Sequence, residues 1–286
     1  MTVEFPAPTG VQSLLGEDEP EYDWLIPNVL ERRDRVIFTG GEGKGKSTLL
    51  RQIGIQISLG IHPFTLEFIG ARSVLLVDLE NTRRQIRREI RKIVGGGDAL
   101  SDEMLRIAAW GGGINLNDDK QRLAFIKVMD EAKPDVLIIG PTYKMAEDLD
   151  KEGASGRLTE FLDAIRMSYD CAIIMESHQP HQVVASDGKK FRPERPYGSS
   201  LWMRWPEFGY CLEDEGRLRP WRGARDADRQ WPDKLVRGGE WPFMAAPHNC
   251  IICGNRLSEK QHKYCSTQCG ATGRKRDERA RDGAVS

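Results

Sequence analysis

The sequence predicts an α/β fold in which a mostly parallel sheet is covered by helices on both faces. Four short apolar segments, at residues 35–39, 73–78, 135–139 and 171–175, are typical of strands buried on both sides. Segments with helical periodicity separate these strands, as in proteins built from repeated strand–helix crossovers. A glycine-rich segment, Gly40–Ser47, joins the first of these strands to a helix.

The other elements follow from local signals along the chain. An apolar lead-in at 24–30 is expected to pack on the core, and a short strand is expected at 105–108. Antiparallel strands are expected at 207–222 around the acidic turn 213–216, whereas 223–247 shows no regular pattern. The expected helices cover 47–59, with Leu49, Leu50, Ile53 and Ile57 on the apolar side; 82–94, with Ile86, Ile90 and Ile93; a segment capped by Asp118 or Asp119, with Leu123, Ile126 and Met129; and a segment with Leu158, Phe161, Leu162 and Ile165.

Composition divides the 286 residues into one large domain and three small parts. We expect a flexible arm at 1–22, the α/β domain at 23–247, a cysteine-rich module at 248–272 and a charged tail at 273–286. The formal net charge of −1 excludes a general attraction to nucleic acid, so any such contact must come from local patches. The chain has no long apolar run and no charged-then-apolar start, so we expect a cytoplasmic protein with no membrane partner.

The most specific motif is the segment Gly40–Ser47, which fits the pattern G-x-x-x-x-G-K-[ST] between a predicted strand and a predicted helix. Backbone N–H groups free of side chains can surround a polyphosphate, and the following helix points its positive end at the same anion. The Lys46 side chain is expected to reach the β- and γ-phosphates, and the Ser47 hydroxyl to coordinate Mg²⁺. The motif therefore predicts binding of a nucleoside triphosphate, with ATP favoured. The residues expected to bind it are Gly40, Gly41, Glu42, Gly43, Lys44, Gly45, Lys46, Ser47 and Thr48.

The order of the motifs resembles a RecA-type ATPase core. After the phosphate loop come strands that end in Val77-Asp78-Leu79-Glu80, in Ile139 and in Met175-Glu176-Ser177-His178. Over residues 24–225 the chain is most similar to single-domain RepA-like replicative helicases and to related phage-encoded ATPases of the AAA family. The resemblance implies a RecA-like P-loop core with antiparallel strands at its C-terminal edge. It also implies a DNA-stimulated ATPase of DNA replication or recombination, a helicase that binds single-stranded DNA as a homo-oligomer, with a hexamer favoured.

The same resemblance implies roles for individual side chains. Glu80 matches the glutamate that orients the attacking water, although it could instead cap the following helix. Asp78 would help to hold the metal or stabilise the loop. His178 matches a side chain that senses the γ-phosphate, unless it only caps its strand. Arg222 and Arg225 match residues that a neighbouring subunit supplies to the γ-phosphate, or else form a solvated basic turn.

One position departs from the family pattern. The third strand usually ends with an aspartate that holds Mg²⁺ through water, but here Ile139 is followed by Gly140-Pro141. Metal binding would then depend on Ser47 and Asp78, and either hydrolysis would be slow or the phosphate oxygens and water would supply most of the ligands. This departure favours a second hypothesis, an ATP-dependent DNA-binding or loading protein that does not unwind DNA. A recombinase-like filament former is a third.

Two loops and one helix are the candidate DNA contacts. In RecA-type proteins the loops after the third and fourth strands face a central channel, where cations would hold a single strand and aromatic rings would stack on bases. The predicted helix at 82–94 carries six cations, but such a run is more often a solvated face or a subunit contact. Trp202 and Trp205 could extend the DNA surface or pack in the core. The loop residues are Lys144, Lys151 and the flexible stretch 153–156 in loop 142–156, and Lys189, Lys190, Phe191, Arg192, Arg195 and Tyr197 in loop 179–198.

Two cysteine pairs form a second specific motif. Cys250 and Cys253 are followed by Cys265 and Cys269, a spacing that suits tetrahedral Zn²⁺. The segment is too small and polar to bury a core, so the metal would supply its folding energy. Four thiolates leave no open position, which indicates a structural site similar to treble-clef and zinc-ribbon modules. Basic residues flank the cluster, so we expect contact with nucleic acid or a replication-protein partner, while the two remaining cysteines are expected to be core residues.

Overall fold

A seven-stranded sheet forms the centre of the computed structural model, which describes residues 7–18, 22–95, 100–180, 183–184, 190–191, 193, 195–223, 229–247, 252 and 264–282. Its strand order is β11-β10-β3-β7-β6-β4-β5, and every neighbouring pair is parallel except β10 with β11. The predicted strands are confirmed to within one residue at each end. They are β3 (Arg35–Thr39), β4 (Val74–Asp78), β5 (Leu105–Ala109), β6 (Val136–Gly140), β7 (Ala172–Glu176), β10 (Phe208–Leu212) and β11 (Leu218–Arg222).

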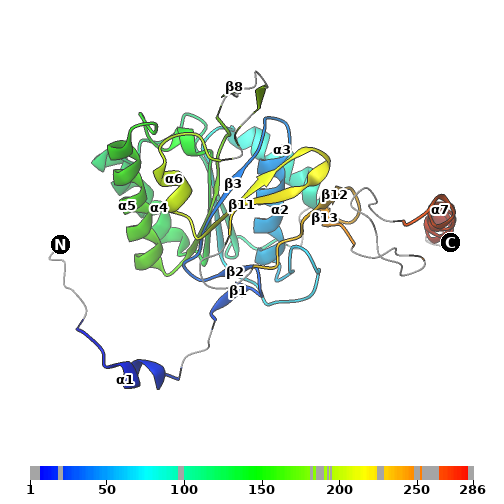
Figure 1. Cartoon of the computed structure of the whole chain (residues 1–286), viewed down its shortest axis with the longest axis horizontal. Helices are drawn as coiled ribbons and strands as arrows, with labels where there is room; N and C mark the ends of the chain where they lie inside the picture. The colour runs from blue at the N-terminus through cyan, green and yellow to red at the C-terminus, as the bar shows by residue number, and fades with distance from the viewer. Residues whose placement is uncertain are drawn as a thin grey trace.

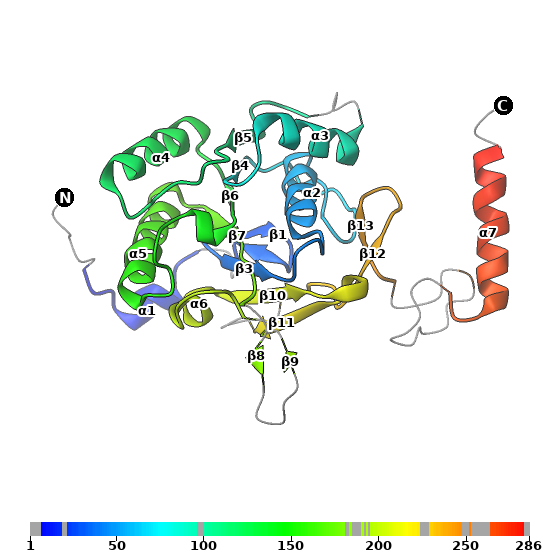
Figure 2. The same ribbon diagram turned by 90° about the horizontal axis from the view of Figure 1, so that it is seen from above.

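Helices cover both faces of this sheet, as the uninterrupted apolar strands predict (Figures 1 and 2). The first face carries α2 (Lys46–Ser58) and α3 (Arg83–Val94), and the second carries α4 (Asp119–Ala132) and α5 (Glu152–Tyr169). Alternate residues of each strand enter opposite cores: in β6, Val136 and Ile138 pack with α2, whereas Leu137 and Ile139 pack with α4 and α5. Burying each such side chain contributes about 1.5–3 kcal/mol, so the two cores fix the strand register.

The strand register brings the functional loops to one edge. Asp78 at the end of β4 lies opposite Gly140 at the end of β6, and Glu176 at the end of β7 lies opposite Phe38 in β3. Because these strands are parallel, the loops that follow β3, β4, β6 and β7 all leave from the same edge of the sheet.

Helix ends agree with the expected capping signals. A capping box begins α3: the Thr82 side chain accepts from the backbone N–H of Gln85, and the Gln85 side chain accepts from the backbone N–H of Thr82. Asp118, rather than Asp119, caps α4. The apolar side expected for α4 was partly wrong: Leu123 is 60% exposed, and Phe125 fills the core with Met129 instead.

The N-terminal lead-in packs on the core as expected. Strands β1 (Trp24–Ile26) and β2 (Leu30–Glu31) pair antiparallel, and Leu25, Ile26 and Leu30 are buried, whereas Trp24 is half-buried. Ahead of them, α1 (Val11–Leu15) lies in the predicted arm, and all its side chains are exposed. None of the described helices combines the length and the apolar content needed to cross a bilayer.

Two segments differ from the sequence interpretation. The region 223–247 is more regular than expected, because β12 (Leu235–Arg237) and β13 (Phe243–Ala245) pair antiparallel and bury Phe243 against α2. The flexible stretch expected at 153–156 is helical and belongs to the first turns of α5. Its small side chains permit close packing: the Ser155 hydroxyl donates to the Leu149 carbonyl at 2.7 Å and accepts from the Trp202 indole at 3.0 Å.

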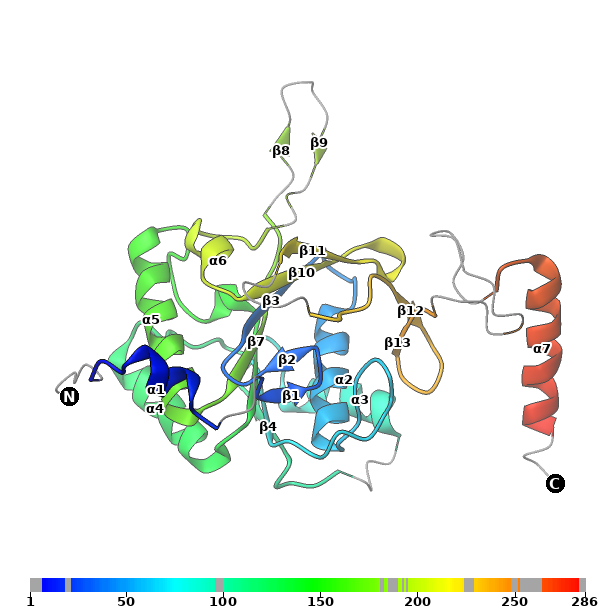
Figure 3. The ribbon, with the colours of Figure 1, turned by 60° about the horizontal axis from the view of Figure 1, so that its bottom comes forward.

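The other elements extend the body. A hairpin of β8 (Val183–Val184) and β9 (Lys190–Phe191) stands out from it, and α7 (Thr267–Asp282) lies apart from the sheet (Figure 3). The short helix α6 (Leu201–Arg204) packs on α5, and the 3₁₀ turns η1 (Thr142–Lys144) and η2 (Asp214–Gly216) follow β6 and β10.

Candidate nucleotide-binding site

The phosphate loop adopts a conformation that requires glycine. Gly45 directly precedes α2 with φ of 96°, and a Cβ atom there would come within 2.8 Å of the Phe243 ring. At the other end of the loop, a Cβ on Gly40 would lie 2.6 Å from the Leu212 carbonyl oxygen. The Phe243 ring and the Leu212 carbonyl thus leave no room for side chains at Gly45 and Gly40. The loop leads into the N-terminus of α2, where the first backbone N–H groups of a helix are available to an anion.

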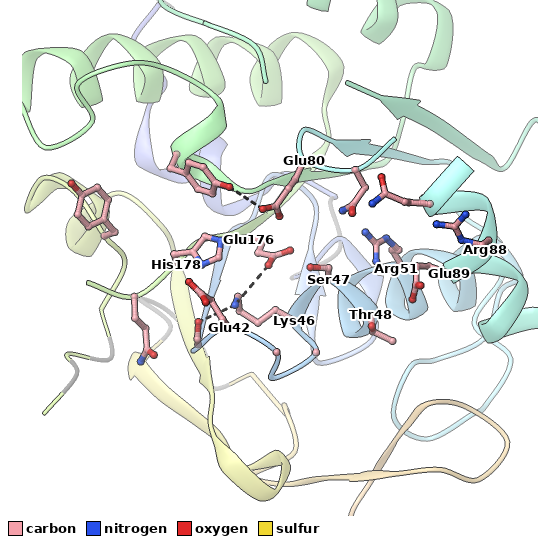
Figure 4. Close-up of a pocket in the computed structure, with 18 of the residues that line it drawn as sticks. Glu42, Lys46, Ser47, Thr48, Arg51, Glu80, Arg88, Glu89, Glu176 and His178 are labelled. Carbon is pink, nitrogen blue, oxygen red and sulfur yellow. Dashed lines mark hydrogen bonds and ion pairs between the residues drawn. The ribbon is translucent and has the colours of Figure 1, made fainter. Parts of the chain in front are cut away.

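An open cavity of about 950 Å³ lies in front of this loop (Figure 4). Its lining comes from the loops after β3, β4, β6 and β7, so distant parts of the sequence converge there. Most of the predicted loop residues line this cavity together with Glu80 and His178, namely Gly40, Glu42, Gly43, Gly45, Lys46, Ser47 and Thr48. Lys44 instead lines a neighbouring cavity with Asp214.

Lys46 is buried at the floor of the cavity. Its Nζ donates to the carbonyl oxygens of Gly40 at 2.9 Å and Gly41 at 3.1 Å, and lies 3.8 Å from the Glu176 carboxylate. Burial lowers the pKa of Lys46, and the neighbouring carboxylate of Glu176 opposes this effect. Phosphate oxygens entering the cavity would give this ammonium an anionic partner, which binds it more strongly than the two neutral carbonyls do.

Glu80, Tyr143 and His178 form a connected group on the opposite side of the cavity. The Tyr143 hydroxyl donates to Glu80 Oε1 at 2.9 Å, and the Tyr143 ring meets the His178 ring edge-on at 5.2 Å. Burial and the bond to Glu80 raise the pKa of Tyr143 to about 12, so the phenol stays a donor at neutral pH. Within the described part of the chain, the buried Nε2 of His178 has no hydrogen-bond partner, which leaves it open to a ligand.

Asp78 is engaged in a buried ion pair. Its Oδ2 accepts from Arg51 at 2.6 Å, while Oδ1 accepts from the backbone N–H groups of Asn81 at 2.7 Å and Glu80 at 3.1 Å. Burial alone would raise the pKa of Asp78, but these bonds, led by the one from Arg51, outweigh burial and hold the pKa below its ordinary value. Asp78 thus stabilises the loop that carries Glu80, the second of the two roles expected for it.

The β12–β13 hairpin supports the phosphate loop from outside, which the sequence did not predict. Arg237 donates through Nη2 to the Lys44 carbonyl at 2.6 Å, and its guanidinium lies over the Phe243 ring at 5.0 Å. Gln52 in α2 joins the hairpin by bonds to both the N–H and the carbonyl of Phe243. Arg237 also lines the cavity, so the hairpin adds a cation to the cavity wall.

The other predicted residues lie elsewhere. Arg222 pairs with Gly209 near the start of β10, at the edge of the sheet opposite the phosphate loop, and donates to the Met203 carbonyl. Arg225 lies outside the described residues. The cations of α3 are exposed, which agrees with a solvated face, and Arg88 among them lines the cavity. Trp202 and Trp205 are buried, so of the two interpretations core packing is correct.

The expected zinc ligands are only partly described. Cys250 and Cys253 lie outside the described residues, while Cys265 and Cys269 have their sulfur atoms 3.7 Å apart. In the part of the chain that the structure describes, no group of three or more His, Cys, Asp or Glu side chains is arranged to hold a metal ion. Cys171 and Cys211 are buried core residues, as expected.

Comparison with known proteins identifies the family. The family model described as "AAA domain" matches residues 3–183, which is more than half of the chain. Among solved structures, the chain resembles the KaiC-like protein PH0186 from the hyperthermophilic archaeon Pyrococcus horikoshii OT3, with 18% sequence identity and a TM-score of 0.48, over 80% of this chain and 96% of that one. No curated protein matches. With its phosphate loop at the edge of a mostly parallel sheet, the chain therefore belongs to the AAA domain family and is a P-loop ATPase.

Proposed function

We propose that this chain is a DNA-stimulated ATPase of DNA replication or recombination, of the RepA-like helicase type. One observation carries the proposal: His178 lies both in the nucleotide cavity and at the base of the β8–β9 hairpin. The backbone N–H of Tyr197, on the returning side of the hairpin, donates to the His178 carbonyl at 2.8 Å. A displacement of His178 would therefore reach both ends of the hairpin.

Each residue of the cavity has a separate role in hydrolysis. The loop N–H groups and Lys46 hold the phosphates, and Glu80 orients a water molecule towards the γ-phosphate. Tyr143 fixes the Glu80 carboxylate by its hydrogen bond. When Mg²⁺ is bound beside Ser47, it neutralises charge on the phosphates. Loss of the γ-phosphate removes the ligand that Nε2 of His178 would contact.

The hairpin is the candidate contact for single-stranded DNA. Its sequence carries Lys189, Lys190 and Arg192 with the aromatic residue Phe191, and the exposed ring of Tyr197 lies where the hairpin meets the cavity. Cations interleaved with aromatic rings suit a phosphate backbone with stacked bases. We infer that the nucleotide state is transmitted to this contact through His178.

Assembly and the zinc module belong to the same proposal. A homo-oligomer, with a hexamer favoured, would bring Arg222 or Arg225 of one subunit to the γ-phosphate of the next. Four thiolates around Zn²⁺ with bonds of about 2.3 Å place neighbouring sulfurs about 3.8 Å apart. The separation of 3.7 Å between Cys265 and Cys269 fits that geometry. The module would anchor DNA or a replication partner in the cytoplasm.

A loading protein is the second candidate. Of the two loops expected to grip DNA, the one at 142–156 is anchored by the buried side chains of Met145 and Leu149, and its last residues, from Glu152, belong to α5. A single projecting hairpin suits ATP-dependent retention of DNA better than stepwise unwinding. This candidate would assemble on DNA with ATP bound and release it after slow hydrolysis.

Strand displacement distinguishes the two candidates. A helicase unwinds a tailed duplex with ATP, and Lys46→Ala abolishes the unwinding because the phosphates lose their buried cation. A loader shows ATP-dependent retention on single-stranded DNA without unwinding. If ATP changes neither unwinding nor DNA retention, both candidates are wrong.

A further inference from the structure

The end of β6 lacks the acidic residue that the family pattern places there, and a neighbouring strand carries one. β6 ends with Gly140, which has no side chain, while β7 beside it ends with the buried residue Glu176. The pairing of Ile139 with Met175 makes Gly140 and Glu176 adjacent across the two strands. A carboxylate is thus present at this edge of the sheet, displaced by one strand.

Steric exclusion links the two positions. A Cβ atom built on Gly140 would lie 2.7 Å from the Cβ of Glu176 and 3.1 Å from its backbone nitrogen. Cβ atoms do not approach this closely, so an aspartate at 140 and the observed Glu176 cannot both occupy this geometry. The glycine makes room for the glutamate.

The Glu176 carboxylate is directed to the place where a metal would meet the phosphates. Its side chain lines the nucleotide cavity together with Ser47 (Figure 4). Both residues also line a small cavity of about 30 Å³ that extends to Asp78 and Gly140. Among described residues its polar partner is Lys46, at 3.8 Å, which is beyond hydrogen-bond distance. Asp78, the other carboxylate at this edge, is occupied by Arg51 and backbone N–H groups.

We propose that Glu176 supplies the protein carboxylate for Mg²⁺ at the nucleotide, in place of an acid after Ile139, with the Ser47 hydroxyl as its companion ligand. Mg²⁺ in phosphate sites is typically held by one or two carboxylates, the phosphates and water, and Glu176 and Ser47 provide such a set. The inference rests on the proposed function only in requiring that a nucleotide binds in this cavity. It removes the reason to expect intrinsically slow hydrolysis.

The test measures metal and nucleotide binding separately. The full chain is titrated with Mn²⁺ in the presence of ADP and followed by electron paramagnetic resonance, and ADP affinity is measured by calorimetry with and without Mg²⁺. In Glu176→Gln, which keeps the side-chain shape, we expect the Mn²⁺ affinity of the ADP complex to fall about tenfold or more. The affinity for metal-free ADP should stay the same or rise, because the carboxylate no longer competes for Lys46.

Two further variants complete the design. Glu131→Gln removes an exposed carboxylate of α4 and should bind Mn²⁺ like the wild type. The exchange Glu176→Gly with Gly140→Asp relieves the Cβ contact and should recover much of the Mn²⁺ affinity. Wild-type Mn²⁺ affinity in Glu176→Gln would overturn the inference and leave the nucleotide site intact. Failure of the wild type to bind ADP at all would overturn the nucleotide site itself.

Discussion

The buried ion pair between Arg51 and Asp78 permits a stability prediction that also separates two roles for Asp78. Substituting Asp78→Asn removes the negative charge but retains a side chain of the same size. Both partners are almost fully buried, with exposed side-chain fractions of 7% and 8%. The Arg51 guanidinium would remain in the interior without its counter-charge.

The expected cost follows from that burial. Removing one partner of a buried pair typically destabilises a protein by about 3–5 kcal/mol. The asparagine oxygen can still accept from the Asn81 or Glu80 backbone, so we expect the lower end, about 3 kcal/mol of unfolding free energy. Glu152→Gln is the control, because its pair with Arg204 is exposed and should cost less than about 1 kcal/mol.

Urea denaturation followed by tryptophan fluorescence measures this difference, provided that the slope of the transition is unchanged. Mn²⁺ affinity of the ADP complex should be nearly that of the wild type, since Asp78 serves the loop rather than the metal. A loss of stability no greater than that of Glu152→Gln would refute the argument. So would a large loss of Mn²⁺ affinity without a loss of stability.

The same pair has a predictable pH dependence. The pKa of Asp78 is lower in the folded state than in the unfolded chain, where it is about 3.9. The folded state therefore binds the proton less readily, and the stabilisation is complete above the unfolded pKa and is lost as pH falls through the folded pKa. The stability difference between wild type and Asp78→Asn should be full at pH 7 and shrink below about pH 4.

Three further predictions concern the cavity and the cysteine module. Tyr143→Phe removes the donor to Glu80, so kcat should fall about tenfold with little change in ADP affinity, measured by steady-state kinetics and calorimetry. Arg237→Ala removes the bond to the Lys44 carbonyl, and ATP affinity should weaken by up to about tenfold; unchanged affinity would show that the hairpin does not support the loop. Cys269→Ser should reduce bound zinc from about one ion per chain to a trace by elemental analysis, and an absence of zinc in the wild type would contradict the module.

The fold could be predicted where a local motif, such as the glycine-rich loop, lay between a clear strand pattern and a clear helix pattern. The strand at 35–39, the glycines of the loop and the following helix each point to the same structure, so the P-loop core was identified correctly. The strands within 223–247 were not predicted, because they are held by the burial of Phe243 against α2, and a contact between residues so far apart leaves no periodic pattern in the sequence.

Individual site residues could be predicted only where their position at the end of a predicted strand indicated a chemical role. Glu80 and His178 stand at strand ends, and the structure brings both to the cavity. Tyr143 reaches the cavity from a turn and Arg237 from a distant hairpin, and no local sequence pattern predicts that either residue lies there. The sequence does carry a signal for Glu176, because a carboxylate that ends an apolar strand beside His178 is rarely placed there by packing alone.

The coupling of ATP hydrolysis to DNA is the central claim, and the hydrolysis rate measured with and without single-stranded DNA tests it most directly. The wild-type rate should rise when single-stranded DNA is added, and both rates should fall to background in Lys46→Ala. The mass of the protein in solution, measured with ATP present, should exceed that of one chain. A wild-type rate that single-stranded DNA leaves unchanged would contradict the claim.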